Sequence, residues 1–453
     1  MLVVLALYVG AQLALGLWIA RRVQSEDDFL VAGRRLGPVL ATVSIFATWF
    51  GAETCVGAAG SIYEDGLGWH SVEPFGYGLC LLLLGALFAA RLWRTGVTTV
   101  ADLFGERFGG SAARIAAVLM VPTSLLWAGA QIRAFGHVLA ANSDGLFGLE
   151  AALWIAAAIV IVYTSAGGLL ADVVTDLVQG IALTLGLIAL LIGVVAQLGG
   201  IGAAVDAVAA RLPERAPEPL GPLEIAELWA IPVFGSLAAQ EIVSRTLAAR
   251  SPGLARRAGL LGGGLYVLVG LIPVTLGLLG RVVADVEDPE QLLPTLANAH
   301  MPRIVNLLFA GALVSAMLST VDSCLLAASS VLTRNLVGSL GARSPRGKLL
   351  AARVTAVACG LAAFAIAHEG DSVSDLVEEA SGFGSAGIFV LFCLALRGRP
   401  GRWSAAAANG CLLGGAAAWI VGRYVLDAAT PFLWSLAFAI AGLALGAMLR
   451  RRR

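Results

Sequence analysis

The chain has 453 residues, of which 58% belong to the hydrophobic types and only 13% are charged. Soluble proteins carry about a quarter charged residues, so this composition excludes an ordinary water-soluble protein. The 30 basic and 30 acidic residues balance, so no net charge favours a nucleic-acid partner. The hydrophobic residues form long blocks, and about 20 apolar residues cross a bilayer as a helix. The sequence therefore predicts an all-α integral membrane protein whose partner is the lipid bilayer.

Thirteen apolar segments between charged or Gly/Pro-rich breaks are predicted to be transmembrane helices. The first lacks a basic n-region and is followed by Arg21 and Arg22, so we interpret it as a retained helix rather than a signal peptide. Residues 199–224 contain several prolines and are expected to form a loop without a folded domain. The thirteen segments are 2–20, 36–60, 66–90, 115–141, 151–164, 169–198, 225–248, 259–279, 304–332, 349–367, 373–396, 405–421 and 432–449.

Basic residues follow the first, third, seventh, ninth, eleventh and thirteenth predicted helices. Examples are Arg21 and Arg22 after the first helix and residues 450–453 after the last, whereas the opposite loops are acidic or neutral. By the positive-inside rule, we expect a multi-pass protein of the plasma (inner) membrane with its N-terminus outside and its C-terminus in the cytoplasm.

No residue pattern indicates enzyme chemistry. The six cysteines lie in apolar segments without CxxC spacing, and the four histidines are not at metal-ligand spacing. The sequence contains no Gly-rich phosphate loop and no nucleophile elbow. We therefore expect a protein that is not an enzyme, with its machinery among the helices.

The second predicted helix carries polar and small residues in mid-membrane. Thr48 and Glu53 lie there, and Gly51 and Gly57 lower helix propensity where an opened backbone would expose carbonyl groups. A tightly packed Gly/Ala face is the alternative explanation of the glycines.

The ninth predicted helix has the densest polar pattern. Ser315, Ser319, Asp322 and Ser323 share one stripe, which Thr320 borders. Such serines often only bond to their own helix carbonyls, but a carboxylate in lipid needs a cation, a proton or a donor beside it. Because sodium prefers oxygen ligands, these hydroxyls and the carbonyls of an opened facing helix would suit a sodium ion.

Two further helices carry charged residues. Asp172 and Asp176 lie one turn apart on the sixth helix. We interpret Asp172 as solvated near the cytoplasmic edge, and Asp176 as deep enough for a role with an ion or a proton. On the seventh helix, Glu241 and Arg245 at i,i+4 spacing are expected to form a salt bridge, with a gating role as the alternative.

Five strings of residues resemble the sodium:solute symporter family, in the same order and over nearly the whole length of the chain. They are Gly33-Arg-Arg-Leu-Gly, residues 47–60, residues 163–179, residues 240–251 and Ala316-Met-Leu-Ser-Thr-Val-Asp-Ser.

The resemblance implies a transporter in which ion and substrate bind near mid-membrane beside broken helices, and access alternates between the two sides. It also implies a core of two five-helix repeats of inverted topology. The implied parts are a first helix and cytoplasmic loop (1–35), the first repeat (36–198), an extracytoplasmic loop (199–224), the second repeat (225–400) and two peripheral helices with a basic tail (401–453).

The resemblance implies a main site for a co-transported sodium ion between the second and ninth helices. Carried over by position, its ligands are the carbonyls of Ala47, Phe50 and Ala316 and the hydroxyls of Ser319 and Thr320.

Some family members hold a second sodium ion, and Asp176, Asp322 and Ser323 occupy the matching places here. A proton-coupled permease or exchanger of the same architecture, with Asp176 or Asp322 as the proton carrier, stays open. An integral-membrane enzyme or channel is a third, more distant class.

Within the family, the sequence is most similar to the choline-transporter branch, and it also resembles the proline-transporter-like branch. Trp49, Tyr77 and Trp127 match three aromatic residues of the choline cage, whereas a small residue near Ala239 replaces the fourth. The resemblance therefore leaves proline, other amino acids and related zwitterions open beside an amine. Glu53 and Glu73 are expected to balance a positive charge on the substrate.

Overall fold

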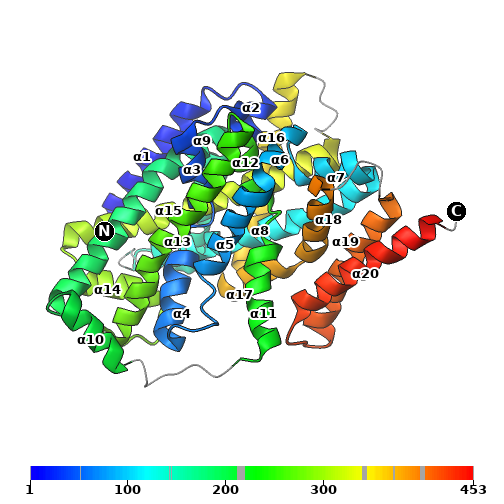
Figure 1. Cartoon of the computed structure of the whole chain (residues 1–453). Helices are drawn as coiled ribbons and strands as arrows, with labels where there is room; N and C mark the ends of the chain where they lie inside the picture. Colours follow the sequence, from blue (N-terminus) through cyan, green and yellow to red (C-terminus); the bar gives the residue numbers. More distant parts are fainter. Residues whose placement is uncertain are drawn as a thin grey trace.

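The computed structural model describes residues 2–51, 53–141, 143, 145–211, 220–338, 344–370, 373–397 and 403–451, and over these residues it is helical, without a strand (Figure 1). Nine of the described helices are long and apolar enough to cross a membrane, and a bent pair, Pro222–Gly235 with Gln240–Ala248, makes a tenth. Shorter apolar helices cover Ala6–Ala20 and Pro38–Ala47. The all-α membrane class is thus confirmed, while the count of thirteen spans stays a prediction.

The helices follow one another closely along the chain. Those of the first half are α1 (Leu2–Ala20), α2 (Glu26–Val31), η1 (Ala32–Arg34), α3 (Pro38–Ala47), η2 (Glu53–Gly57), α4 (Ala58–Asp65), α5 (Phe75–Leu83), η3 (Leu84–Phe88), α6 (Ala89–Thr95), α7 (Val100–Phe108), α8 (Gly110–Ala141), α9 (Leu149–Gln197) and α10 (Ile201–Arg211). The helix α10 lies in the segment that was expected to be a loop.

The second half continues in the same way. Its helices are α11 (Pro222–Ala230), η5 (Ile231–Gly235), α12 (Gln240–Ala248), α13 (Pro252–Val283), η6 (Pro289–Gln291), α14 (Leu292–His300), α15 (Arg303–Val331), η7 (Leu332–Val337), α16 (Pro345–Glu369), α17 (Val373–Gly382), α18 (Ser385–Arg397), α19 (Ala405–Ile420), η9 (Val421–Val425) and α20 (Pro431–Arg451). Proline opens α3, α11, α13 and α16, where its missing N–H costs no helical hydrogen bond.

The second predicted helix is interrupted in its middle. The helix α3 ends at Ala47, residues 48–51 form turns, and η2 restarts the helix as a π-helical turn at Glu53. The seventh predicted helix is interrupted too, because η5 ends at Gly235 and α12 starts at Gln240 with a bend of 41°. Both interruptions leave backbone polar groups available in mid-span.

Within α9 the chain reverses its direction sharply at Gly168, which has a φ of 58°. The hydroxyls of Tyr163 and Thr175 are hydrogen-bonded, although residues twelve apart in a straight helix are separated by about 18 Å. A Cβ atom on Gly168 would lie 2.8 Å from the carbonyl oxygen of Phe29, so the reversal needs glycine. The sixth predicted helix therefore folds back beside the fifth.

The helix α15 is the centre of the molecule. Every residue from Gly311 to Val331 is buried, so this helix is covered all round, chiefly by α8 and α9. In contrast to this central helix, α19 and α20 lie at one edge of the molecule, where they pack along each other (Figure 1). The polar stripe of α15 is thus enclosed by protein and not by lipid.

Candidate functional site

A small cavity lies where the end of α3 meets α9 and α15. It has a volume of about 10 Å³, which is room for about one water-sized sphere. Four of the five residues assigned to the main sodium site line it, namely Ala47, Phe50, Ala316 and Ser319. The remaining lining residues are Phe46, Gln179, Gly180 and Leu183.

The backbone beside this cavity departs from helical hydrogen bonding. In a continuous helix the N–H of Gly51 would donate to the carbonyl of Ala47, but it donates to the carbonyl of Trp49 at 2.8 Å. A Cβ atom on Gly51 would lie 2.6 Å from Oγ1 of Thr320, so glycine permits the close approach of the break to α15. Thr320 itself donates to the carbonyl of Ala316 at 3.2 Å. The break therefore brings all five assigned residues to one place.

Asp176 of α9 connects the cavity to a second group of polar residues. Its Oδ1 accepts a hydrogen bond from Ser319, and its Oδ2 accepts one from Ser44 at 2.6 Å. Because the hydroxyl of Ser319 donates its hydrogen bond to the carboxylate, its oxygen lone pairs remain for an ion. One turn along α9, Oε1 of Gln179 is buried without a hydrogen-bond partner in the described part of the chain, and Gln179 lines the cavity.

Arg245 reaches from α12 into the same buried group. Its Nη2 forms an ion pair with Asp172, lies 3.6 Å from Oδ2 of Asp176 and donates to Oγ of Ser323 at 2.5 Å. The side chains of Arg245, Asp172 and Asp176 are at most 1% exposed.

Two expectations about these charged residues were wrong. Asp172 is not solvated, because the reversal at Gly168 turns its helix into the protein. Arg245 does not pair with the carboxylate of Glu241, which accepts a hydrogen bond from Ser124 at 2.5 Å instead. The guanidinium group points inward to Asp172 and Asp176. It offsets the buried negative charge of these two carboxylates, which a pair with Glu241 would not do.

Asp322 completes the second group. Its Oδ1 accepts a hydrogen bond from Thr164, and no ion pair reaches it from the described residues. Asp172, Asp176 and Asp322 are all fully or almost fully buried, and Arg245 is the one basic residue paired with any of them in the described part. If all three are ionised, two negative charges stay uncompensated, which is costly in a buried site unless a cation or protons bind there.

The three aromatic residues assigned to the substrate come together from three helices. The ring centroids of Trp49 and Tyr77 are 5.6 Å apart, and those of Tyr77 and Trp127 are 6.3 Å apart with an edge-on orientation of 78°. All three are at least nine-tenths buried. The hydroxyl of Tyr77 lies 3.2 Å from that of Ser381 in α17. This contact links the first predicted repeat, which holds the three aromatic residues, to the second.

A carboxylate stands beside this aromatic group. Tyr266 of α13 lies within 3.5 Å of both carboxylate oxygens of Glu73, 2.5 Å from the hydroxyl of Thr54 and 3.4 Å from the carbonyl of Trp49. Glu73 is therefore anchored to the break in the second predicted helix. The side chain of Glu53 lies outside the described part of the structure. Ala239, near which the resemblance implies a small residue in place of a fourth aromatic, is the N-cap of α12 at the second break.

Sequence reasoning missed several members of these groups. Ser44, Thr164, Tyr266 and Ser381 each place a hydroxyl on a predicted site residue. Their signal in the sequence is weak, since a single hydroxyl in an apolar helix usually bonds to its own backbone.

A search of solved structures finds close similarity over the whole chain. A Na⁺-coupled sialic acid symporter in a substrate-bound outward-open state matches with a TM-score of 0.83 and 19% identity, covering 98% of this chain and 97% of that one. Mhp1, a nucleobase-cation-symport-1 family transporter, matches with a TM-score of 0.60 and 18% identity, covering 93% of this chain and 94% of that one. These likenesses confirm the predicted fold class, with its five-plus-five inverted-repeat core.

Relatives of known function are transporters and not enzymes. The high-affinity choline transporter 1 of Drosophila melanogaster is 26% identical over 353 residues, which cover 72% of this chain and 54% of that protein. The chain thus spans little more than half of that relative. The high-affinity proline transporter PutP of Bacillus subtilis is 28% identical over 435 residues, which cover 89% of this chain and 88% of that protein. The family model for sodium:solute symporters matches residues 29–417. The chain belongs to the sodium:solute symporter family.

Proposed function

We propose that this protein carries a small organic solute into the cell by sodium-coupled symport with alternating access. The observation that supports it best is the cavity of about 10 Å³ at the break after α3, which Ala47, Phe50, Ala316 and Ser319 line. A broken helix facing hydroxyl-bearing residues is how such transporters hold sodium within a membrane. The family to which the chain belongs agrees with this proposal.

In the proposed main site, the ion takes the carbonyl oxygens of Ala47, Phe50 and Ala316 and the hydroxyl oxygens of Ser319 and Thr320. Both hydroxyls already donate a hydrogen bond elsewhere, Ser319 to Asp176 and Thr320 to the carbonyl of Ala316. Each oxygen can therefore face a cation with its lone pairs. The nearby carboxylate of Asp176 adds electrostatic attraction through Ser319.

We propose the group of Asp176, Asp322 and Ser323 as the place of a second cation. The excess of buried carboxylates over Arg245 supports a second positive charge there. The hydroxyl of Ser323 donates to the carbonyl of Ser319 and accepts a hydrogen bond from Arg245, so one of its lone pairs is left for a second sodium. A proton on Asp322 would compensate the same charge. Asp322 forms no ion pair with the described basic residues, and this observation favours the proton-coupled alternative.

The proposed substrate is a cationic amine or a zwitterion bound by Trp49, Tyr77, Trp127 and Glu73, with Glu53 as a further carboxylate. Aromatic faces attract a cation by up to about 2 kcal/mol when water is excluded, and the three rings are buried. The carboxylate of Glu73 is held close to the carbonyl of Trp49 by Tyr266. Choline and proline, the solutes named for two relatives, both carry a positively charged nitrogen.

The proposed orientation in the plasma (inner) membrane has the N-terminus outside and the basic C-terminus in the cytoplasm. Basic residues then lie on the cytoplasmic side, as the positive-inside rule requires. Solute would reach the proposed substrate residues from outside, together with sodium, and leave towards the cytoplasm.

The test is uptake by the purified chain in sealed vesicles. Choline, proline and a sugar are offered in turn, under an inward sodium gradient, an inward proton gradient or neither. We expect concentrative uptake of a positively charged or zwitterionic solute with the sodium gradient alone. Accumulation that follows the proton gradient without sodium would favour the alternative, and failure to concentrate any solute of a wider amine and amino-acid panel would refute the symport proposal.

A further inference from the structure

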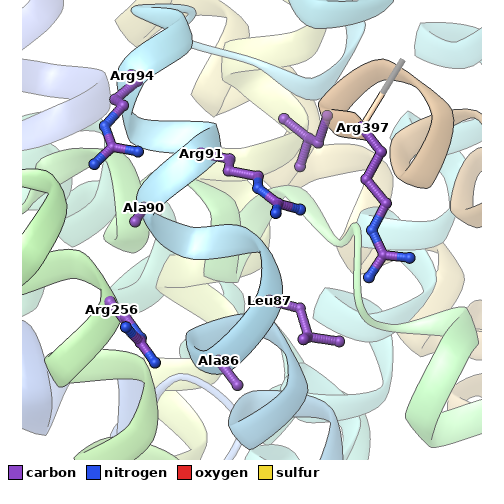
Figure 2. A pocket seen from close by; sticks show the side chains of 8 residues that line it. Ala86, Leu87, Ala90, Arg91, Arg94, Arg256 and Arg397 are labelled. Atoms are coloured by element: carbon purple, nitrogen blue, oxygen red, sulfur yellow. The ribbon is translucent and has the colours of Figure 1, made fainter.

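A second, larger cavity lies away from the proposed transport site, among the helices η3, α6, α13 and α18. It has a volume of about 620 Å³ and is open to its surroundings. Figure 2 shows that it is lined by arginines from three of these helices and by the small apolar side chains of η3 and α6. The arginines are Arg91, Arg94, Arg256 and Arg397.

The four arginines bring an excess of positive charge to this cavity. All four are exposed, and none forms an ion pair with an acidic side chain among the described residues. No acidic residue lines the cavity within the described part of the chain. Several positive charges on one concave surface raise the local concentration of anions. Guanidinium groups in particular match the geometry of a phosphate group.

The cavity is formed by features of the fold and not by chance positions of surface side chains. Backbone atoms of Gly85 and Gly259 are so close that a Cβ atom on Gly85 would lie 2.8 Å from the carbonyl carbon of Gly259. Two residues that line the cavity are close to this contact in the chain, since Ala86 follows Gly85 and Arg256 lies one turn before Gly259. Across the cavity, the guanidinium of Arg397 is held 5.5 Å from the ring centroid of Phe88.

The floor of the cavity lies inside a membrane-spanning segment. Ala86 and Leu87 are exposed side chains of the span Phe75–Thr95, and Leu87 lies about 12 Å before its end at a rise of 1.5 Å per residue. The arginines of this span, Arg91 and Arg94, stand nearer that end. The surface is therefore apolar at membrane depth and cationic at the membrane edge.

We propose that this cavity binds an anionic phospholipid. Its phosphate contacts Arg91, Arg94, Arg256 and Arg397, and its acyl chain lies along Ala86 and Leu87. A free phosphate would use the arginines but would leave the apolar floor uncovered, which is why the lipid is the better occupant. Basic pockets between transmembrane helices on the cytoplasmic side are suited to such headgroups.

A lipid in this place would join helices that also reach the proposed substrate site. The span that carries Arg91 and Arg94 begins with α5, which holds Tyr77, and α13 holds both Arg256 and Tyr266. Tyr77 is one of the proposed substrate-binding residues, and Tyr266 contacts another of them, Glu73. The bound lipid is thus placed to stabilise one relative position of these two helices.

The experiment measures thermal unfolding of the purified full chain in detergent. Phosphatidylglycerol, phosphatidylcholine and inorganic phosphate are added in separate titrations. The variant Arg256→Gln/Arg397→Gln removes two of the four cations, and Arg257→Gln is the matched control because Arg257 is an exposed neighbour that does not line the cavity. We expect phosphatidylglycerol to raise the unfolding temperature of the wild-type chain and of the control, with at least about tenfold weaker binding to the double variant.

Three results would overturn the proposal. The first is an equal response of wild type and double variant to phosphatidylglycerol. The second is an equal response of the wild-type chain to phosphatidylcholine, and the third is a response to inorganic phosphate that matches the lipid's, which would assign the site to a free anion. If the double variant does not fold, the single variant Arg91→Gln is compared with Arg257→Gln by native mass spectrometry, and equal retention of phosphatidylglycerol would refute the proposal.

Discussion

The hydroxyl of Ser319 in α15 donates its hydrogen bond to the carboxylate of Asp176 in α9. This bond connects the small cavity at the break after α3 with the buried group of aspartates. A residue proposed to bind the main sodium ion is thus oriented by a residue proposed to bind a second cation, so changes in either group should alter sodium dependence.

Replacement of Ser319 or Thr320 by alanine should weaken sodium activation of uptake. Each substitution removes one proposed oxygen ligand and leaves a partly dehydrated ion, so we expect the half-saturating sodium concentration to rise about tenfold or more. The measurement is initial uptake as a function of sodium concentration. Ser329→Ala is the control, because Ser329 is buried on the same helix and its hydroxyl bonds, among the described residues, to the carbonyl of Leu326 alone, at 3.0 Å. An unchanged half-saturation in both variants would remove these hydroxyls from the site.

The substitution Asp176→Asn should damage ion coupling while Arg245 keeps its pair with Asp172. The amide keeps the size of the side chain but removes the charge beside Ser319, Ser44 and Arg245. We expect sodium-driven accumulation to fall more than tenfold at equal amounts of protein in the membrane. Normal accumulation would make Asp176 a structural residue.

The substitution Asp322→Asn tests whether the second cation is a sodium ion or a proton. If a second sodium binds there, the sodium dependence of uptake should lose its cooperativity, with a Hill coefficient falling from near two to near one. If a proton binds there, the Hill coefficient should stay the same and the pH dependence of uptake should change. If neither the Hill coefficient nor the pH dependence changes, the buried charge of Asp322 plays no part in coupling.

These sites differ in how far the sequence could predict them. The break after α3 was predictable because glycine weakens a helix locally, and the residue that marks it, Gly51, is visible in one string of the sequence. The pairing of Arg245 was not, because i,i+4 spacing pointed to Glu241 whereas its partner Asp172 lies 73 residues away. Nor does α15 show a preferred face, since it is buried all round, so the contacts of its individual hydroxyls depend on the packing of its neighbours.

The substitution Glu73→Gln should reduce the affinity for a cationic substrate. It removes the negative charge beside the aromatic residues but leaves a side chain of the same size near Tyr266. We expect about a tenfold increase in the half-saturating concentration of an amine, and a smaller change for a zwitterion, whose own carboxylate already offsets its charge. Tyr266→Phe serves as the comparison, because it removes the hydroxyl near Glu73 and keeps the carboxylate. An equal loss in both variants would indicate that Glu73 acts through structure.

The last prediction concerns Trp49, which stands at the break and contacts Tyr77 at a ring-centroid distance of 5.6 Å. A tryptophan at this place is either a bulky packing residue or part of an aromatic surface for a cation. Phenylalanine keeps an aromatic face, whereas alanine removes it together with up to about 2 kcal/mol of attraction for a desolvated cation. We therefore expect Trp49→Phe to retain part of the affinity for an amine and Trp49→Ala to lose most of it, roughly tenfold or more. Leucine at the same position separates the two roles, since it fills space without a ring. If Trp49→Leu binds the substrate as well as Trp49→Phe does, Trp49 acts by packing alone, and the positive charge of the substrate is then recognised by carboxylates such as Glu73.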